Sequence, residues 1–163
     1  MTVGAGELDL GVRIKSVPWD RETEVASIAQ FDVGIMPLHD GPFERGKCGY
    51  KLIQYMAVGR PVVGSPVGAN CRIIQHGFNG FLANSVQEWT DAILQLYRDF
   101  RLRQRIGAEA RKTVESKYCL QLTAPELASI FKQVVDKHKQ PADSSLRYQI
   151  ATESSGNTGL VPK

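Results

Sequence analysis

Apolar residues in the first half of the chain gather in short runs, and amphipathic stretches separate these runs. Residues Phe31–Leu38 are almost all apolar, which is typical of a parallel strand that is covered on both faces. Further strands are predicted at Val12–Val17, Val62–Gly64 and Gly80–Ala83. Helices are predicted between them at Arg21–Gln30, at Tyr50–Val58 and, as a short helix, at residues 70–75. Strands that alternate with helices through short connections predict an α/β fold with a doubly wound parallel sheet.

The pattern becomes purely helical after Ala83. Three helices are predicted, at residues 86–97, at residues 100–118 and from Ala124 or Pro125 to about residue 139. Asn84 or Ser85 is the candidate N-cap of the first of them. Residues 140–163 have no sustained apolar period, which predicts a disordered tail. We therefore expect one domain at residues 1–139, followed by this tail.

Composition narrows the class of protein only a little. A length of 163 residues with 42% hydrophobic residues suits one soluble globular domain. The net charge of +3 is mild, so an anionic small molecule fits as well as a nucleic acid. No apolar stretch approaches the roughly 20 residues that span a bilayer, and the start of the chain lacks the pattern of a signal peptide. We expect a soluble protein for which only peripheral contact with a membrane stays open.

The three cysteines show no C-x-x-C spacing, which argues against a disulfide framework and against a structural zinc site. A reducing cytoplasm is therefore the expected compartment. Cys48 and Cys71 are expected to be small packed side chains, because no histidine is placed to activate them. Trp19 and Trp89 are expected to pack in the core.

The most informative run lies where the strand at residues 31–38 gives way to the next helix. Gly46, Lys47, Gly49 and Lys51 occupy this junction, and α/β proteins hold phosphate groups at such junctions. The two lysines are four residues apart, so both ammonium groups could point toward the same anion. The alternative is that both are solvated surface lysines. A nucleotide or a sugar phosphate is therefore the leading ligand.

The same run also comes close to the phosphate-binding loop of ATPases and GTPases, Gly-x4-Gly-Lys-Ser/Thr. Residues Gly41–Cys48 match it except at the last position, where Cys48 replaces the hydroxyl that binds magnesium. A thiol is a poor magnesium ligand. The strand at Val62–Gly64 also ends without an aspartate for the metal, since Ser65 follows it. A nucleoside triphosphatase is therefore a remote alternative.

Four motifs, in this order and spacing, resemble the C-terminal, donor-binding domain of the group 1 (family 4) retaining glycosyltransferases. They are Phe31–Leu38, Lys51–Val63, Val67–Asn70 and His76–Leu82. The resemblance covers roughly Thr2 to Lys137. Such enzymes have the GT-B architecture, in which two Rossmann-like domains face each other across a cleft. The resemblance implies a Rossmann-like sheet that forms an incomplete C-terminal half of such an enzyme, without the N-terminal acceptor domain and the first β-α unit.

The resemblance also implies roles for individual residues. The family usually has two glutamates at positions that correspond to Gly46 and Gln54 in this chain. The amide oxygen of Gln54 is implied to accept a hydrogen bond from a ribose hydroxyl, and a helix-surface glutamine is the alternative. Asp40 and Glu44 are weaker candidates to reach the sugar in place of the first glutamate. Gly49 matches a family glycine at which backbone amides approach donor oxygens.

The loop after the next strand completes the implied site. Gly68, Ala69 and Asn70 resemble a family loop that lies near the nucleotide-sugar, and Arg72 stands where the family often has glutamate. The guanidinium of Arg72 would pair with phosphate or simply face water.

The implied activity is retaining sugar transfer, in polysaccharide assembly as a family-level expectation, with a nucleotide-sugar as substrate. It needs no cofactor, no metal and no nucleic acid partner. Catalytic residues are not identified by the sequence. Without the acceptor domain the chain is expected to be inactive, which leaves a non-catalytic nucleotide- or sugar-phosphate-binding module as the alternative.

Overall fold

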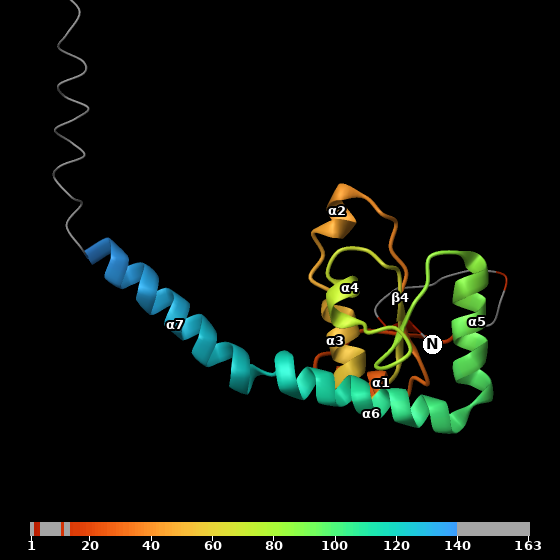
Figure 1. Ribbon diagram of the computed structural model, residues 1–163. Coiled ribbons are helices and arrows are strands. Elements are labelled where there is room, and N and C mark those ends of the chain that lie inside the picture. The colour runs from red at the N-terminus through yellow and green to blue at the C-terminus, as the bar shows by residue number, and fades with distance from the viewer. Residues whose placement is uncertain (1, 4–10, 12–13, 140–163) are drawn as a thin grey trace, which may run out of the picture. The chain divides into compact units, whose positions relative to one another are not determined.

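The computed structural model describes residues 2–3, 11 and 14–139 (Figure 1). The predicted tail at residues 140–163 lies outside the described residues, so its disorder stays a prediction. The chain divides into two compact units, Met1–Leu122 and Thr123–Lys163. The first unit holds all the strands and the candidate site, and the described part of the second belongs to one helix.

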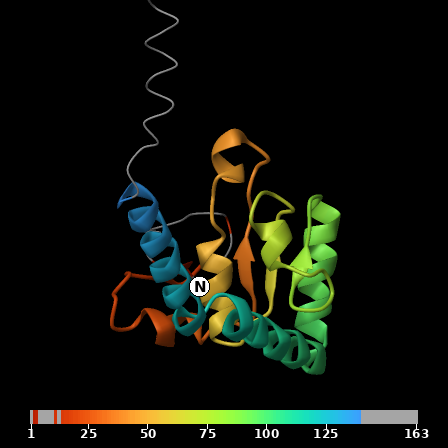
Figure 2. The same cartoon turned by 60° about the vertical axis from the view of Figure 1, so that its left-hand side comes forward.

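The strands of the first unit form two parallel sheets. A two-stranded sheet pairs β1 (Thr2–Val3) with β2 (Ser16–Val17). A three-stranded sheet has the order β3-β4-β5, with strands at Gly34–Met36, Val62–Gly64 and Phe81–Leu82. Helices α3 (Tyr50–Ala57) and α5 (Val86–Arg98) flank this sheet (Figure 2). This arrangement confirms the predicted α/β fold.

Local signals account for the best-predicted elements. Helix α3 ends where the sequence predicts, and Gly59 follows it with φ +72, a left-handed conformation that glycine adopts without steric cost. At the start of α5, Ser85 and Glu88 form a capping box, which selects Ser85 over Asn84 as the N-cap. The remaining helices of the first unit are α1 (Glu24–Ile28), α2 (Pro42–Arg45), α4 (Asn70–Ile73) and α6 (Phe100–Lys117).

Two helices differ from the prediction. The short helix α2 lies between the strand predicted at residues 31–38 and the helix predicted at residues 50–58, where no helix was expected, because four residues are too few to show a period. Pro42 occupies one of its first two positions, where a missing N–H costs nothing. Helix α7 (Leu120–Lys139) begins earlier than predicted and contains Pro125 in its interior. The expectation that this helix begins at Ala124 or Pro125 was therefore wrong.

Two apolar clusters cover the opposite faces of the three-stranded sheet. Val62 and Val63 follow each other in β4, so their side chains point to opposite faces, and each belongs to a different cluster. One cluster joins α3 and α6 through residues such as Leu52, Met56 and Val114. The other joins α5 and α6 through Ala92, Leu96 and Ile106. The half-buried Trp89 packs against the second cluster, as predicted.

Two residues expected in the core are exposed instead. Trp19 is 57% exposed, and its Nε1 donates to Glu24 Oε1 at 2.9 Å. Ile35 is 50% exposed although it lies in β3 between two buried residues. Both neighbours of Ile35 bond to the β4 side, because Gly34 N donates to Pro61 O and Ser65 N donates to Met36 O. The N–H and C=O of Ile35 therefore face the other edge of β3, where the structure describes no paired strand.

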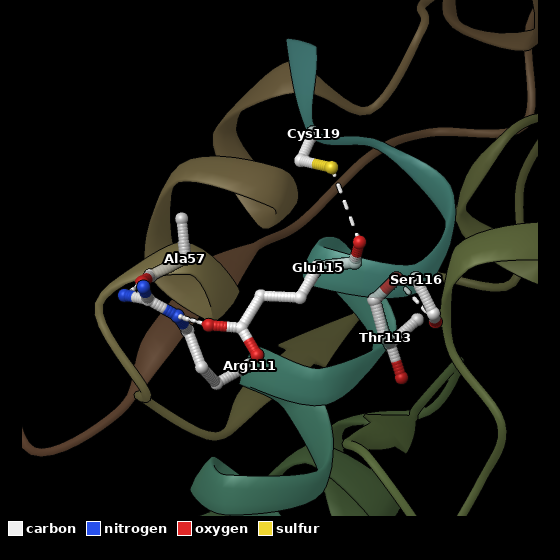
Figure 3. Close-up of polar contacts among 6 residues, drawn as sticks. All are labelled: Ala57, Arg111, Thr113, Glu115, Ser116 and Cys119. Carbon is white, nitrogen blue, oxygen red and sulfur yellow. Dashed lines mark hydrogen bonds and ion pairs between the residues drawn. The ribbon is translucent and has the colours of Figure 1, made fainter. Parts of the chain in front are cut away.

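Helix α6 is tied to the C-terminal end of α3 (Figure 3). The Arg111 guanidinium donates to the Ala57 carbonyl and pairs with Glu115 at 2.6 Å. Cys119 Sγ donates to the Glu115 carbonyl at 3.1 Å. A cation at the C-terminal end of a helix is favourable, because the last carbonyls carry partial negative charge. Helix α6 therefore contacts the C-terminal end of α3 through Arg111. The N-terminal end of α3 lies beside the loops described in the next section.

Candidate functional site

The candidate site is built from two loops at the carboxyl ends of β3 and β4, together with the N-terminus of α3. Gly49 is the N-cap of α3 and has φ +73. A Cβ at this position would collide with Ile73 Cδ1 and lie 3.5 Å from Asn70 Oδ1. Both the backbone angle and the crowding therefore require glycine here. The start of α3 consequently lies against the start of α4.

The second loop reaches the first through Gly68. This residue has φ +54, and a Cβ on it would lie 2.6 Å from the carbonyl oxygen of Arg45. The backbone of Gly68 therefore packs directly on the last residue of α2. Together with the contacts of Gly49 with Ala69 and Asn70, this packing places two segments that the sequence assigned to one site, residues 46–49 and residues 68–70, next to each other.

The two predicted lysines have different surroundings. Lys47 Nζ lies 5.0 Å from the centre of the Phe43 ring and 3.9 Å from Glu44 Oε1. Contacts with α2 therefore orient this ammonium group. Lys51 lies exposed in the first turn of α3, which contains no acidic residue. Its side chain makes no hydrogen bond or ion pair with the described part of the chain, so it is available to an anion.

The backbone adds two donors beside these lysines. The N–H groups of Leu52 and Ile53 already donate to the carbonyl of Gly49. The N–H groups of Tyr50 and Lys51 have no acceptor among the described residues, as expected in the first turn of a helix. The positive end of the helix dipole lies at the same place. Chemically, this end of α3 can bind a phosphate oxygen.

The acidic candidates are engaged with neighbouring bases. Asp40 accepts two hydrogen bonds from the Arg45 guanidinium, at 2.6 and 3.0 Å. These hydrogen bonds hold the pKa of Asp40 below its ordinary value of 3.8. Asp40 thus fixes the α2 loop and is not a free carboxylate. Glu44 is the carboxylate nearest to Lys47.

The other predicted residues contribute in different ways. Gln54 lies half-buried in the second turn of α3, and its side chain has no hydrogen-bond partner among the described residues.

The remaining candidates stabilise the loops. Asn70 is buried, and its Nδ2 donates to the Ser65 carbonyl at 3.0 Å, so it stabilises the loop after β4. Ala69 is also buried, and its Cβ lies 3.7 Å from the position that a Cβ on Gly49 would occupy. Gly46 closes α2, with its N–H donating to the Phe43 carbonyl.

Arg72 lies apart from the two lysines. It lines a cavity of about 510 Å³ between α4 and α6, to which Glu109, Lys112 and Thr113 also contribute. Neither Lys47 nor Lys51 lines this cavity. Its inner wall includes Asn79, whose side chain is satisfied by the Ile73 carbonyl, the Gln75 N–H and the Thr113 hydroxyl.

Arg45 was missed by sequence reasoning, although its side chain pairs with Asp40 and its carbonyl oxygen lies against Gly68. The available signal was Pro42 after Gly41, which marks the start of a short helix that places Arg45. Cys48 and Cys71 were expected to be packed, but both are exposed.

Within the described residues, no group of three or more His, Cys, Asp or Glu side chains is placed to hold a metal ion. None of the described helices is long and apolar enough to cross a membrane.

Comparison with known proteins assigns the chain to a family. Residues 9–99 match the family described as glycosyl transferases group 1. N-acetyl-alpha-D-glucosaminyl L-malate synthase of Bacillus anthracis is 30% identical over 99 residues, which are 59% of this chain and 26% of that protein. The chain therefore spans about a quarter of the length of this curated relative.

Solved structures share the fold at lower identity. Sucrose-phosphate synthase from Thermosynechococcus elongatus has a TM-score of 0.69 at 23% identity, covering 78% of this chain and 32% of that chain. Anabaena HepE in complex with UDP and glucose has a TM-score of 0.65 at 20% identity, covering 74% of this chain and 32% of that chain. These likenesses confirm the Rossmann-like fold of GT-B glycosyltransferases. With more than half of its residues matched, the chain belongs to the group 1 glycosyltransferase family.

Proposed function

We propose that this chain is the donor-binding domain of a retaining glycosyltransferase and that residues 45–51 and 68–70 hold the diphosphate of a nucleotide-sugar. One observation carries the proposal: Gly49, at the N-terminus of α3, has no room for a side chain and lies between two lysines and against the Gly68 loop. The solved Anabaena relative was crystallised with UDP and glucose, which supports a nucleotide-sugar as the ligand class.

The proposed chemistry is stabilisation of the leaving group. As the bond to the sugar breaks, negative charge grows on the diphosphate. The unbonded N–H groups of Tyr50 and Lys51, with the ammonium groups of Lys47 and Lys51, supply positive charge where that anion forms. A metal is not required for this step, because amides and lysines provide the charge.

Gln54 and Glu44 are the proposed contacts to the sugar-containing parts of the donor. Gln54 lies on α3 one turn beyond the phosphate-binding end, and its amide is unsatisfied within the described chain. Its oxygen is therefore available to a ribose hydroxyl. Glu44 Oε1 lies 3.9 Å from Lys47 Nζ, so a sugar bound beside this lysine would also lie near Glu44.

The acceptor site belongs, in this proposal, to an N-terminal domain outside this chain. Two observations support it: the chain covers about a quarter of its curated relative, and β3 presents an edge with the half-exposed Ile35. A strand of a preceding β-α unit would pair with this edge.

The proposal includes retention of the anomeric configuration of the transferred sugar. It also includes inactivity of the isolated chain, because half a cleft cannot orient an acceptor. A cytoplasmic location suits the exposed thiols of Cys48 and Cys71.

Titration calorimetry with UDP, GDP and their sugars tests the proposal. We expect saturable binding that Lys47→Ala and Lys51→Ala each weaken at least about tenfold, since hydrogen bonds to charged groups contribute roughly 1.5–3 kcal/mol. Lys112→Ala is the matched control, because Lys112 lies in the separate cavity and pairs with Glu109.

Family membership favours this function over the nucleoside triphosphatase alternative. Absence of any nucleotide binding would refute the proposed site, and a loss caused by Lys112→Ala alone would move it to the cavity between α4 and α6. Sugar transfer by the isolated chain would refute the predicted inactivity.

A further inference from the structure

The turn between α5 and α6 carries two aromatic side chains that face solvent. We define the α5–α6 corner as residues Tyr97–Arg101 together with Arg105. Tyr97, near the end of α5, is 76% exposed, and Phe100, the first residue of α6, is 59% exposed. Figure 1 shows the sharp change of direction between the two helices at this corner. Neither aromatic residue belongs to either apolar cluster of the core.

The corner is held in one conformation by its own hydrogen bonds. Asp99 caps α6, since its Oδ1 accepts from the Leu102 N–H at 2.9 Å. Arg103 caps the end of α5, because its Nη1 donates to the carbonyls of Leu96 and Tyr97 at 2.7 and 2.9 Å. The same guanidinium lies 5.4 Å from the centre of the Phe100 ring. The two aromatic side chains are therefore presented from a fixed turn.

The charges of the corner are strongly one-sided. Arg98, Arg101 and Arg105 are exposed, and their side chains have no ion pair or hydrogen bond with any residue that the structure describes. Asp99 is the one acidic residue of the corner. The first turn of α6 contains no acidic residue. A basic residue there faces the positive end of the helix dipole, so Arg101 does not stabilise its own helix. The cationic pattern instead matches an anionic partner.

We propose that the α5–α6 corner is a peripheral docking surface for an anionic lipid membrane. Aromatic side chains are favoured at the level of the lipid headgroups, where an apolar ring meets water. Guanidinium groups bind lipid phosphates through paired hydrogen bonds. Basic residues close to an anionic leaflet each add to its attraction for the protein. The corner combines the two kinds of side chain on one protruding turn.

Two other surfaces fit an anionic membrane less well. Helix α7 exposes more apolar side chains, but its lysines alternate with Glu126 and Asp136, and nothing described shows what covers it. The cavity between α4 and α6 has its Lys112 already paired with Glu109 at 2.8 Å. A nucleic acid is disfavoured at the corner, because its exposed rings lie on a turn and not in a basic groove that tracks a strand.

Co-sedimentation of the full chain with vesicles tests the proposal. Vesicles contain phosphatidylcholine alone or with added phosphatidylglycerol, and binding is expected only to the anionic mixture. Arg98→Glu/Arg101→Glu should reduce the partition coefficient at least about 25-fold, since each basic residue near the surface contributes about fivefold. Tyr97→Ser/Phe100→Ser should also reduce it. Lys15→Glu/Arg21→Glu removes the same charge from exposed residues outside the corner and should reduce it much less.

Three results would overturn the proposal. One is an equal loss for the corner variant and the Lys15/Arg21 control, which would indicate net charge alone. Another is full binding by both corner variants together with loss in Phe131→Ser/Val134→Ser, which would assign the contact to α7. The third is binding to duplex DNA as tight as binding to vesicles. Thermal melting verifies that each variant is folded, and the inference stands or falls independently of nucleotide binding at α3.

Discussion

Replacing Gly49 with alanine tests whether the candidate site depends on the close contact between its two loops. Gly49 is buried and begins α3 with φ +73. An added methyl group would overlap Ile73 Cδ1 and touch Ala69 Cβ at 3.7 Å, an ordinary van der Waals contact. The substitution therefore combines a backbone penalty with a packing penalty at the point where α3 meets α4.

The two penalties can be estimated separately. A left-handed conformation costs a non-glycine residue about 1–2 kcal/mol. Inserting a methyl group into a filled site costs about 1–3 kcal/mol. The atom in the way is the end of a flexible side chain, so the packing cost belongs to the lower part of that range. We expect Gly49→Ala to lower the free energy of unfolding by about 2–4 kcal/mol.

Urea denaturation measures this loss, and two further variants separate its causes. Gly77 has φ +76 and no atom within 4 Å of a built Cβ, so Gly77→Ala should show the backbone penalty alone. Ile73→Val removes the crowding atom and should restore part of the stability of Gly49→Ala, although alone it costs about 0.5–1.5 kcal/mol. Equal losses for Gly49→Ala and Gly77→Ala, without rescue by Ile73→Val, would refute the close contact.

Three further predictions follow from the site and its scaffold. Leu96→Ala, at a fully buried position between α5 and α6, should lower the free energy of unfolding by about 2–5 kcal/mol in urea denaturation. Hydrogen bonds from the N–H groups of Asn84 and Ser85 lower the pKa of Glu88 from its ordinary value of 4.5, so its stabilising effect is present above that pH and is lost as the pH falls through the lowered pKa. Glu88→Gln should therefore flatten the acid limb of a stability–pH profile, and an unchanged limb would count against this capping role. Lys51→Ala should weaken UDP binding more than uridine binding in calorimetry, and equal losses would contradict a phosphate contact.

The sequence predicted elements whose limits are marked by local chemistry. Helix α3 and strand β4 were placed to within a residue, because Gly59 ends the helix and Pro61 prevents its continuation. Helix α7 was misplaced at its start, because Pro125 is a local signal that the helix nevertheless accommodates in its interior. A local signal reflects the backbone conformation that one residue prefers. It predicts the end of a helix or strand only where the neighbouring residues favour the same boundary.

Burial was harder to predict, because it depends on elements distant in the sequence. Ile35 belongs to an apolar run and was expected to be covered, yet β3 has no described strand on its outer edge. Trp19 was expected in the core, but it is 57% exposed and its Nε1 donates to Glu24 Oε1. The contact of Gly68 with Arg45 is also tertiary, so the sequence could group the two loops only through the family resemblance.

The replacement of both family glutamates changes what the proposed site can use. Gly46 and Gln54 remove two negative charges from the positions at which the resemblance places them. The proposed phosphate contacts at the N-terminus of α3 do not depend on these glutamates, because they come from backbone N–H groups and from Lys47 and Lys51. Lys51 pairs with no residue that the structure describes, whereas Lys47 Nζ lies 3.9 Å from Glu44 Oε1, so Lys51 is the lysine with less internal competition for a diphosphate. We therefore expect the proposed donor binding to be kept, whereas orientation of the sugar would depend on Glu44 and on the proposed N-terminal domain.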